Sequence, residues 1–457
     1  MANLDIKKPH VLIVGAGLGG VLLAILLDRQ GVSYEIFERS SKVKPLGSVI
    51  CLNANILPIF EQLGLWDEFK TLSYPTVTTQ FLKGNMDVIA SLLGDYLAEA
   101  VGYDFQLLSR TTLYEMLLSR IASEKIHYNK KVTDVAQDDK SATITCSDGT
   151  SYTGDIIVGA DGTYSGVRQS LFKQLEKAKL LPASDSKSLN KAYICLVGTT
   201  DPMDPEKFPL FKKDGAIFSL VIGDGQYSWS TVNVPGRRMC WDVVVQLKSS
   251  GDDVRNAEWK AEGNEAMINE IRNFKVPLGC TMGDLIDATP KDGISRVYLE
   301  DKIFETWNHK RVVLLGDSCH KLLPSSGQGA INAMQDAVIL ANCIYDLQSL
   351  STKHITEALQ DYRDQRYPFA LEQYKASNLS AKILFGQKWY ERALRKVALS
   401  YLPASFRDKG QMRNLAYQPQ ITYLPFATKR GKITLVRQKP SRRYQEEQAK
   451  AKAAQAV

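Results

Sequence analysis

The sequence lacks the features of disulfide-rich, zinc-binding and membrane-spanning proteins. Its seven cysteines stand singly among 457 residues, with no CxxC pair, and an odd count argues against a disulfide framework. No run of about 18 or more apolar residues is present, so a membrane-spanning helix is not expected. The N-terminus shows no signal-peptide pattern. We therefore expect a cytoplasmic protein in a reducing compartment, without a bound metal.

The net positive charge of the chain comes from its C-terminal tail. The net charge is +7, but the segment from Thr428 to the end carries nine Lys or Arg against two Glu, which accounts for all of it. A nucleic-acid-binding protein usually spreads its basic residues over a folded surface, so no nucleic-acid partner is expected. The tail from about residue 431 is rich in Lys, Arg, Gln and Ala, a composition that predicts a flexible segment.

The first 40 residues carry the strongest local pattern. A short apolar strand, His10–Val14, precedes a glycine-rich turn, an apolar helix follows over residues 19–30, and Tyr34–Phe37 forms a second strand. Such a βαβ unit implies a parallel sheet.

The turn of this unit reads Gly15-Ala16-Gly17-Leu18-Gly19-Gly20. Gly15 permits the tight turn, Gly17 lets a pyrophosphate approach the backbone, and Gly20 lets helix and strand pack closely. Glu38, at the end of the second strand, can accept hydrogen bonds from ribose hydroxyls. The unit predicts a bound dinucleotide, but it does not by itself separate FAD from NAD.

A second pattern is a buried strand, Asp155–Gly159, that runs into Ala160-Asp161-Gly162 and then a helix. Asp161 is either a helix N-cap or part of a cofactor site, and the pattern alone leaves both interpretations open.

The third pattern begins with the apolar strand Arg311–Leu315 and continues through Gly316-Asp317. Asp317 at the strand end can hold the ribityl hydroxyls of a flavin, and Pro324 gives a rigid turn. Gly327 and Gly329 let a flat ring lie against the backbone. A helix that begins near Gln328 would point its positive end at that ring and stabilise the anionic reduced form.

Between these segments the pattern changes to alternating apolar and polar residues, over 190–298, which predicts an antiparallel sheet. Long helices are predicted from about Gln328 to Asp346 and from Thr356 to about Gln373. The fold class is therefore α/β: a Rossmann-type FAD-binding domain with an inserted, mainly antiparallel substrate sheet and a helical C-terminal region. The expected division is residues 1–75, 101–185 and 296–375 for the FAD domain, 76–100 and 186–295 for the substrate domain, 376–430 for the helical region and 431–457 for the flexible tail.

The three motifs in this order resemble the group A flavoprotein monooxygenases, the para-hydroxybenzoate hydroxylase-like family. The resemblance covers about residues 9–375, and the spacing is similar to that of the fungal secondary-metabolite members. It implies a non-covalent, tightly bound FAD. Besides Gly15, Gly17 and Gly20, the cofactor-binding residues that it implies are Glu38 with the adjacent Arg39, Gly47, Ser48 and Val49 beside the flavin, Arg110, Asp161 with Arg168 in the DG motif, Asp317, Pro324, Gly327, Gly329 and Ala330.

The resemblance also implies a reaction. NAD(P)H, a transient co-substrate with no glycine motif of its own, reduces FAD, and a flavin C4a-hydroperoxide then hydroxylates or epoxidises an electron-rich aromatic or polycyclic small molecule. Two alternatives remain: an FAD-dependent reductase or desaturase of the same fold, and a non-enzymatic protein with a flavin-binding fold. Neither the substrate nor the oligomeric state follows from the sequence.

Two features stay open. His320, next to the GD motif, is either a catalytic base or a residue that packs the loop. Residues 383–402 carry Trp389, Tyr390 and several Lys and Arg, a basic amphipathic pattern. Such a helix either packs on the main body or lies on an anionic membrane surface.

Overall fold

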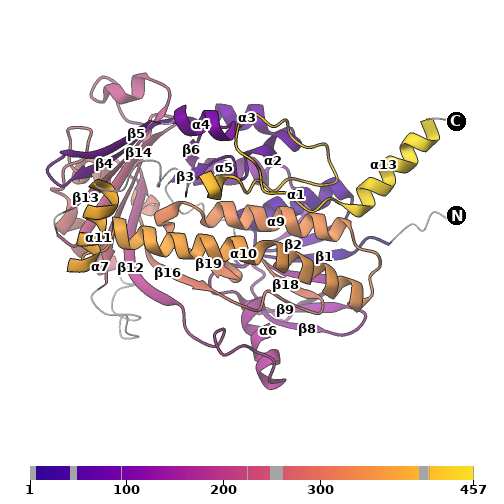
Figure 1. Cartoon of the computed structure of the whole chain (residues 1–457). Helices are drawn as coiled ribbons and strands as arrows, with labels where there is room; N and C mark the ends of the chain where they lie inside the picture. Colours follow the sequence, from indigo (N-terminus) through magenta and orange to yellow (C-terminus); the bar gives the residue numbers. More distant parts are fainter. Residues whose placement is uncertain are drawn as a thin grey trace.

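The computed structural model describes residues 7–41, 49–93, 95–223, 225–247, 261–400, 410 and 412–455. A parallel sheet with its helices forms one half of the molecule and a large curved sheet forms the other (Figure 1). The long helix α10 (Thr352–Leu384) runs from the first half to the second and contacts strands of both sheets. The mixed α/β architecture that the sequence predicts is confirmed.

The parallel sheet has six strands, in the order β17-β18-β11-β1-β2-β7. Its central strand, β1, is the apolar run that follows the N-terminus, and it pairs in parallel with β2 and with β11. Only the edge strand β17 runs antiparallel to its neighbour. The strand bounds are β1 His10–Val14, β2 Ser33–Phe37, β7 Ile126–His127, β11 Ile156–Gly159, β17 Asn308–His309 and β18 Val312–Leu314.

One helix, α1, forms the centre of this half. Eleven of its thirteen residues are buried, as a helix that is apolar on nearly every side requires. It packs closely along α9, and a Cβ at Gly19 would lie 3.0 Å from the Ala333 carbonyl oxygen of that helix, so glycine favours this close approach. A small antiparallel sheet, β10-β9-β8, completes this half. Its elements are α1 Leu18–Gln30, α2 Leu57–Gln62, α3 Trp66–Thr71, α5 Arg110–Leu118, α6 Gly166–Lys177, α9 Gly329–Tyr345, β8 Val132–Gln137, β9 Ala142–Cys146 and β10 Ser151–Gly154.

The second half is a ten-stranded sheet in the order β19-β16-β12-β15-β14-β13-β4-β6-β3, with β5 paired to β4. Pairing is antiparallel except between β13 and β4, as the alternating pattern predicts. Strands β3 and β6 come from the early part of the chain and extend this sheet to the half with the parallel sheet. That half is called the flavin half below, because the sequence predicts a flavin site there. The elements are β3 Val49–Leu52, β4 Tyr74–Lys83, β5 Val88–Leu93, α4 Asp95–Val101, β6 Gln106–Ser109, β12 Asn190–Thr199, β13 Ala216–Ile222, β14 Tyr227–Val234, β15 Arg238–Gln246, α7 Ala261–Ile271, α8 Met282–Asp287, β16 Ser295–Ile303 and β19 His320–Lys321.

The C-terminal helices differ from the prediction in their limits. Helix α9 ends within one residue of the expected position, but α10 begins four residues earlier and ends eleven residues later than the pattern indicates. A separate helix, α11 (Trp389–Ser400), follows a break at residues 385–388. The expected single helix over 383–402 is therefore wrong at its start: Phe385 is buried as the C-cap of α10.

The C-terminal segment contacts the main body where the structure describes it. Residues 412–441 lie along the flavin half, Ile421 has no exposed surface, and Gln62 hydrogen-bonds its amide and carbonyl. Helix α13 (Arg442–Gln455) follows, and its preceding residue Ser441 donates to Asp346 at 2.6 Å. The flexible segment expected over 431–457 stays a prediction. The domain boundaries themselves remain a proposal.

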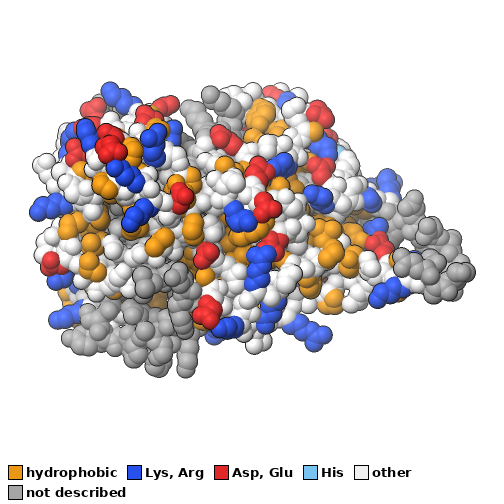
Figure 2. Space-filling model, turned by 90° about the horizontal axis from the view of Figure 1, so that it is seen from above, with side chains coloured by type: hydrophobic (Ala, Val, Ile, Leu, Met, Phe, Trp, Pro, Cys, Tyr) orange, Lys and Arg blue, Asp and Glu red, His pale blue; other side chains and the backbone are white. Residues whose placement is uncertain are grey.

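None of the described helices is long and apolar enough to cross a membrane. On the face drawn in Figure 2, Lys and Arg are interspersed with Asp and Glu and no field of one sign stands out.

Candidate flavin site

Two adjoining cavities meet at the glycine turn. One, of about 430 Å³, extends toward the large sheet, and the other, of about 880 Å³, extends along the end of β2. Gly17, Ala160 and Gly162 line both cavities. The two spaces therefore form one trench, which runs from the end of β2 past the start of α1 to the large sheet.

The glycine turn forms the middle of the trench. Gly15 has φ +105°, and a Cβ there would lie 2.4 Å from the Ala160 carbonyl oxygen. A Cβ at Gly20 would lie 2.2 Å from the Gly15 carbonyl oxygen, whereas a Cβ at Gly17 would meet nothing within 4 Å. Gly15 and Gly20 are thus required by packing, and Gly17 opens onto the trench.

Helix α1 begins at this opening without a side-chain cap and without an acidic residue in its first turn. Its first backbone N–H groups have no intrahelical acceptor, and the helix dipole makes this end positive. The geometry fits a pyrophosphate, which would accept these N–H groups.

Glu38 and Arg39 line the larger cavity at the end of β2. The Glu38 carboxylate accepts hydrogen bonds from the backbone N–H of Ala16 at 3.0 Å and of Ser40 at 2.9 Å. It therefore holds the glycine turn in place as well as facing the space that a ribose would occupy. Three lysines that the sequence pattern did not single out also line this cavity: Lys130, Lys131 and Lys173.

The DG motif lies between the two cavities. One oxygen of Asp161 accepts the backbone N–H groups of Gly166 and Val167 at 2.7 and 3.2 Å, so it caps the start of α6. The other oxygen, Oδ1, is buried without a partner. Burial raises the pKa of Asp161, although Ser165 and the helix amides act against this rise. Both interpretations of Asp161 thus retain support: it is a helix cap, and its buried free oxygen lies beside the trench.

Arg168 of the same motif points inward. It donates to the carbonyl oxygens of Ser318 at 2.8 Å and Thr163 at 2.7 Å, and it is 5% exposed. It therefore joins the DG and GD loops and does not line either cavity.

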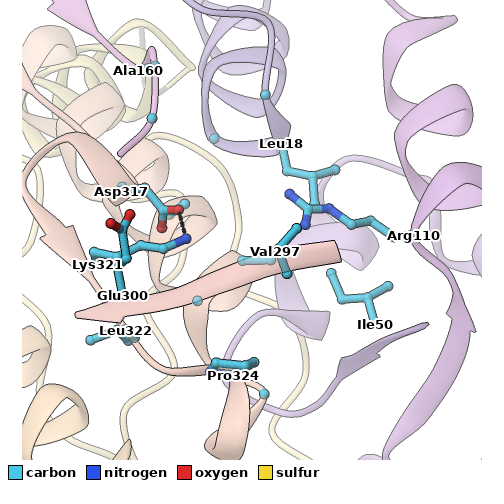
Figure 3. Close-up of a pocket in the computed structure, with 18 of the residues that line it drawn as sticks. Leu18, Ile50, Arg110, Ala160, Val297, Glu300, Asp317, Lys321, Leu322 and Pro324 are labelled. Carbon is cyan, nitrogen blue, oxygen red and sulfur yellow. Dashed lines mark hydrogen bonds and ion pairs between the residues drawn. The ribbon is translucent and has the colours of Figure 1, made fainter. Parts of the chain in front are cut away.

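The GD motif forms the floor of the smaller cavity. Asp317 points into it and makes an ion pair of 2.5 Å with Lys321 (Figure 3). Burial would raise the pKa of Asp317, but Lys321, His320 and Arg110 outweigh burial and hold it below its usual range. The carboxylate is thus kept ionised as a hydrogen-bond acceptor. No sequence motif marks Lys321, although it stands four residues after Asp317.

The segment after the GD motif leaves space for a flat group. Pro324, Gly327, Gly329 and Ala330 all line the smaller cavity. A Cβ at Gly327 or Gly329 would meet nothing within 4 Å, so both glycines open onto the cavity. Helix α9 begins at Gly329 without a side-chain cap. Its positive end can therefore stabilise negative charge that develops on a ring bound here.

Arg110 and Val49 line the opposite side. Arg110 is the first residue of α5, and Figure 3 shows its guanidinium across the cavity from Asp317. Val49 begins β3, which pairs with the strand that ends just before Arg110. The two remaining predicted residues, Gly47 and Ser48, lie outside the described residues.

The large sheet closes the cavity through β16. Val297, Leu299 and Glu300 line it, and the Glu300 carboxylate accepts from the Tyr164 hydroxyl at 2.8 Å and pairs with Lys191 at 3.3 Å. No motif marked Glu300, because alternation along a strand shows which face a residue takes but not what that face meets.

His320 lies behind the loop. It is 1% exposed, it contacts Asp336 at 2.6 Å, and it lines neither cavity. Cys319, His320 and Asp336 lie close enough together to hold a metal ion, but Asp336 already forms an ion pair with the guanidinium of Arg366 at 2.7 Å. A cation there would be repelled by that guanidinium, so the group is a hydrogen-bonded loop anchor. The alternative of His320 as a substrate base has no geometric support.

Comparison with known proteins agrees with this geometry. The FAD binding domain family matches residues 8–197 and 254–377. The FAD-dependent monooxygenase janM of Penicillium janthinellum is 30% identical over 366 residues, which cover 78% of this chain and 74% of the relative. The FAD-dependent monooxygenase ausM of Penicillium brasilianum is 27% identical over 441 residues, 93% of this chain and 89% of the relative.

Solved structures share the fold. HpxO of Klebsiella pneumoniae, in complex with FAD and uric acid, superimposes with a TM-score of 0.74 at 21% identity, over 92% of this chain and 100% of that one. For 2,6-dihydroxypyridine-3-hydroxylase of Arthrobacter nicotinovorans the TM-score is 0.68 at 18% identity, over 84% and 94%.

The fold and the trench define a flavoprotein with FAD as its cofactor. The chain belongs to the FAD binding domain family and, within it, to the FAD-dependent monooxygenases of the para-hydroxybenzoate hydroxylase-like group.

Proposed function

We propose that this monooxygenase hydroxylates or epoxidises an electron-rich aromatic or polycyclic small molecule, with NADH or NADPH as the reductant. The observation that carries this proposal is the position of the smaller cavity. It lies between the GD loop and β16, so a substrate on the large sheet would face a flavin bound in the trench. A bound FAD, once reduced, would supply the chemistry that activates O₂, and one oxygen atom of that O₂ would pass to the substrate.

The residues of this chain have separate tasks in that reaction. The first N–H groups of α1 bind the pyrophosphate, and Asp317, kept ionised by Lys321, accepts hydrogen bonds from the ribityl chain. The uncapped start of α9 stabilises the negative charge of the reduced ring. Together they fix the ring at the mouth of the substrate sheet.

The large sheet excludes water from the reacting atoms. Its apolar side chains Val297 and Leu299 line the flavin cavity, and Phe218 and Leu220 lie on the same face. Water at this point would divert the oxygen to hydrogen peroxide, so a dry apolar wall favours transfer to the substrate. An apolar wall also suits a polycyclic substrate better than a small polar one.

An oxygen-electrode assay tests the proposal. The FAD-loaded protein is supplied with NADPH or NADH and with polycyclic candidate substrates, and oxygen uptake and hydrogen peroxide are measured together. A substrate should raise oxygen uptake while the fraction released as peroxide falls. Reduction or desaturation of the candidates without a substrate-dependent oxygen requirement would favour the reductase or desaturase alternative.

Helix α11 supports a second proposal, peripheral contact with an anionic membrane. Trp389 and Val397 are 82% and 52% exposed on one side of the helix, whereas Arg395 points inward and donates to the Ile383 carbonyl oxygen. An exposed apolar strip with Lys and Arg along its edge matches an interfacial helix. The basic residues at that edge are Lys388, Arg392 and Lys396.

Co-sedimentation with phosphatidylserine-containing vesicles tests this contact. Wild-type protein should bind at low salt and release at high salt, and Trp389→Ser should weaken binding several-fold. Leu180→Ser, at another residue that is 62% exposed, is the matched control and should bind as wild type does. Absence of binding at low salt would contradict the proposal.

A further inference from the structure

The large sheet has two faces with different partners. On one face, Trp241 and Trp229 pack with residues of α7 and α8 in a closed apolar core. On the other face, residues paired across neighbouring strands project together toward the flavin half. Strand pairing places Val297, Cys195 and Val244 in one row of this second face, across β16, β12 and β15.

This second face looks onto the flavin cavity. Val297 lines that cavity and is 40% exposed. On one side of the face, Leu299 packs with Phe385 from the end of α10. On the other side, Phe218 and Val49 pack against the same buried cluster, and Val49 itself lines the flavin cavity. The centre of the face lies between these two packed margins.

One ionisable residue occupies that centre. Asp242, on β15, pairs with Val197 on one side and with Ser230 on the other, so all three share the flavin-side face. The Ser230 hydroxyl donates to Oδ2 of Asp242. None of the described residues donates to Oδ1, and this atom is not fully buried.

The apolar surroundings of Asp242 make an oxygen without a hydrogen-bond donor unfavourable for the stability of the protein. Val197 is its apolar neighbour on β12, Val244 follows on the same face of β15, and the buried thiol of Cys195 lies close enough to interact electrostatically with the carboxyl. Burial raises the pKa of Asp242 to about 6, against the hydrogen bond from Ser230. A carboxylate on an apolar wall lowers stability unless a donor reaches it, so a bound ligand would supply what the protein does not.

The distance from the flavin cavity to Asp242 indicates how long the substrate must be. It is two strands from Val297, about 10 Å across the sheet, and two residues along, a further 7 Å or so. A three- or four-ring molecule with one end at the flavin could span this distance, whereas a single ring could not.

We propose that Asp242 is a substrate-recognition residue, whose Oδ1 accepts a hydrogen bond from a hydroxyl, amine or indole N–H at the far end of a polycyclic substrate. This inference rests on the proposed function, since it names the substrate class of the same site. It excludes substrates that present a carboxylate or phosphate at that end, because like charges would meet. Asp242 acts in binding and orientation, not in the transfer of oxygen.

Matched ligand pairs test the proposal without turnover. The probes are 2-aminofluorene with 2-(dimethylamino)fluorene, and 2-hydroxyfluorene with 2-methoxyfluorene. In each pair methylation removes the hydrogen-bond donor at one end of the molecule. Binding to the oxidised holoenzyme is followed through the change in flavin absorbance near about 450 nm. Wild-type protein should bind the donor member about tenfold more tightly than its methylated partner, as a hydrogen bond to a charged group predicts.

Two variants and a control complete the experiment. Asp242→Leu removes the acceptor and should abolish the preference for the donor member, and Asp242→Asn, which keeps the shape and removes the charge, should reduce it several-fold. Asp201→Asn, at an exposed carboxylate near the end of the sheet, should keep the wild-type preference.

The proposal is overturned if wild-type protein binds neither donor member more tightly than its partner, or if Asp242→Leu keeps the preference. Failure of the proposed function is distinguishable: protein that takes up no FAD, or that takes up FAD but never consumes oxygen, contradicts that function. Flavin-loaded, oxygen-consuming protein without a donor preference contradicts only the role of Asp242.

Discussion

Arg366 donates a hydrogen bond from Nε to Oδ1 of Asp336 at 2.7 Å, and neither side chain has any exposed surface. The second oxygen, Oδ2, accepts the backbone N–H of Gly316 at 2.9 Å and contacts His320 at 2.6 Å. The pair therefore connects α10 and α9 to the GD loop. Because Asp317 follows Gly316 directly, the position of the flavin-facing carboxylate depends on this buried ion pair.

Replacement of Arg366 tests that dependence. Arg366→Leu leaves the Asp336 charge buried without its main partner, which should lower the free energy of unfolding by about 3–5 kcal/mol. The variant should also lose FAD during purification, because the GD loop is no longer anchored. Thermal melting and the flavin-to-protein absorbance ratio measure the two effects.

The control is Arg413→Leu, which breaks an exposed pair with Glu372, where the side chains are 75% and 47% exposed. Such pairs contribute little, so its melting temperature should match that of wild type. An Arg366→Leu protein that melts at the same temperature as wild type and keeps its FAD would contradict the anchoring role.

Replacement of Asp317 should affect the cofactor and not the fold. Asp317→Ala removes an ionised acceptor from the smaller cavity, and the dissociation constant for FAD should rise about tenfold or more. The matched control is Asp361→Ala, which breaks a similar Asp–Lys pair, with Lys439 at 2.7 Å, away from the trench. Fluorescence titration of apoprotein with FAD measures both. Equal affinities for the two variants would exclude Asp317 from the cofactor site.

Stability should depend on pH in opposite directions at two carboxyls. Burial alone would raise the pKa of Asp336, but His320 and Arg366 outweigh it and lower this pKa to about 2. Its contribution of about 2 kcal/mol is thus present above about pH 4 and is lost as pH falls toward about 2. Asp242 has its pKa raised to about 6, so its folded form holds a proton more tightly and its contribution falls as pH rises from about 4 through about 6.

Thermal melting of the Asp242→Asn protein across a range of pH tests the predicted direction of the Asp242 effect. The variant should melt above wild type at pH 8, where wild type bears the half-buried charge, and the difference should shrink toward pH 4. The control is Asp201→Asn, at a side chain that is 65% exposed, and its melting temperature should equal that of wild type at every pH. A destabilised Asp242→Asn protein at pH 8 would show that this carboxylate has a stabilising partner besides Ser230 in the free protein.

The C-terminal segment should be part of the cooperative unit. Asn342, on α9, donates to the Gln420 carbonyl oxygen at 2.9 Å and accepts from the Thr422 backbone N–H at 3.1 Å. Asn342→Ala removes both buried bonds and should cost about 2 kcal/mol, with earlier proteolysis of the tail. Asn85→Ala, in an exposed turn, is the control. Unchanged melting and unchanged proteolysis would show that the tail contributes nothing.

The sequence predicts the flavin half well because backbone geometry is encoded there. Gly15 and Gly20 mark a turn whose packing excludes other residues, Gly17 opens onto the trench, and the strand before them is apolar after His10. Asp317, Pro324 and Gly327 likewise come close together because they follow one another in the chain. Every described residue of these motifs lines the trench or supports its wall.

Long-range contacts explain what the sequence does not show. Glu300 and Asp242 are ordinary strand residues until the register of the sheet places them on faces that meet the flavin half. Arg366 lies at an unremarked position of a long helix, and its partner is 30 residues away. Residues 431–457 have a composition typical of a flexible segment, yet the Asp346 carboxylate on the main body accepts hydrogen bonds from the Ser441 hydroxyl and the Arg443 backbone N–H.

Turnover under ¹⁸O₂ tests the central claim most directly. The FAD-loaded protein, with NADPH or NADH, is incubated with polycyclic compounds that carry a hydrogen-bond donor, and products are analysed by mass spectrometry. A monooxygenase should incorporate one ¹⁸O atom from the gas into the product and none from H₂¹⁸O. Products that gain or lose two hydrogens without any label would contradict oxygen transfer and would assign the chain to reduction or desaturation.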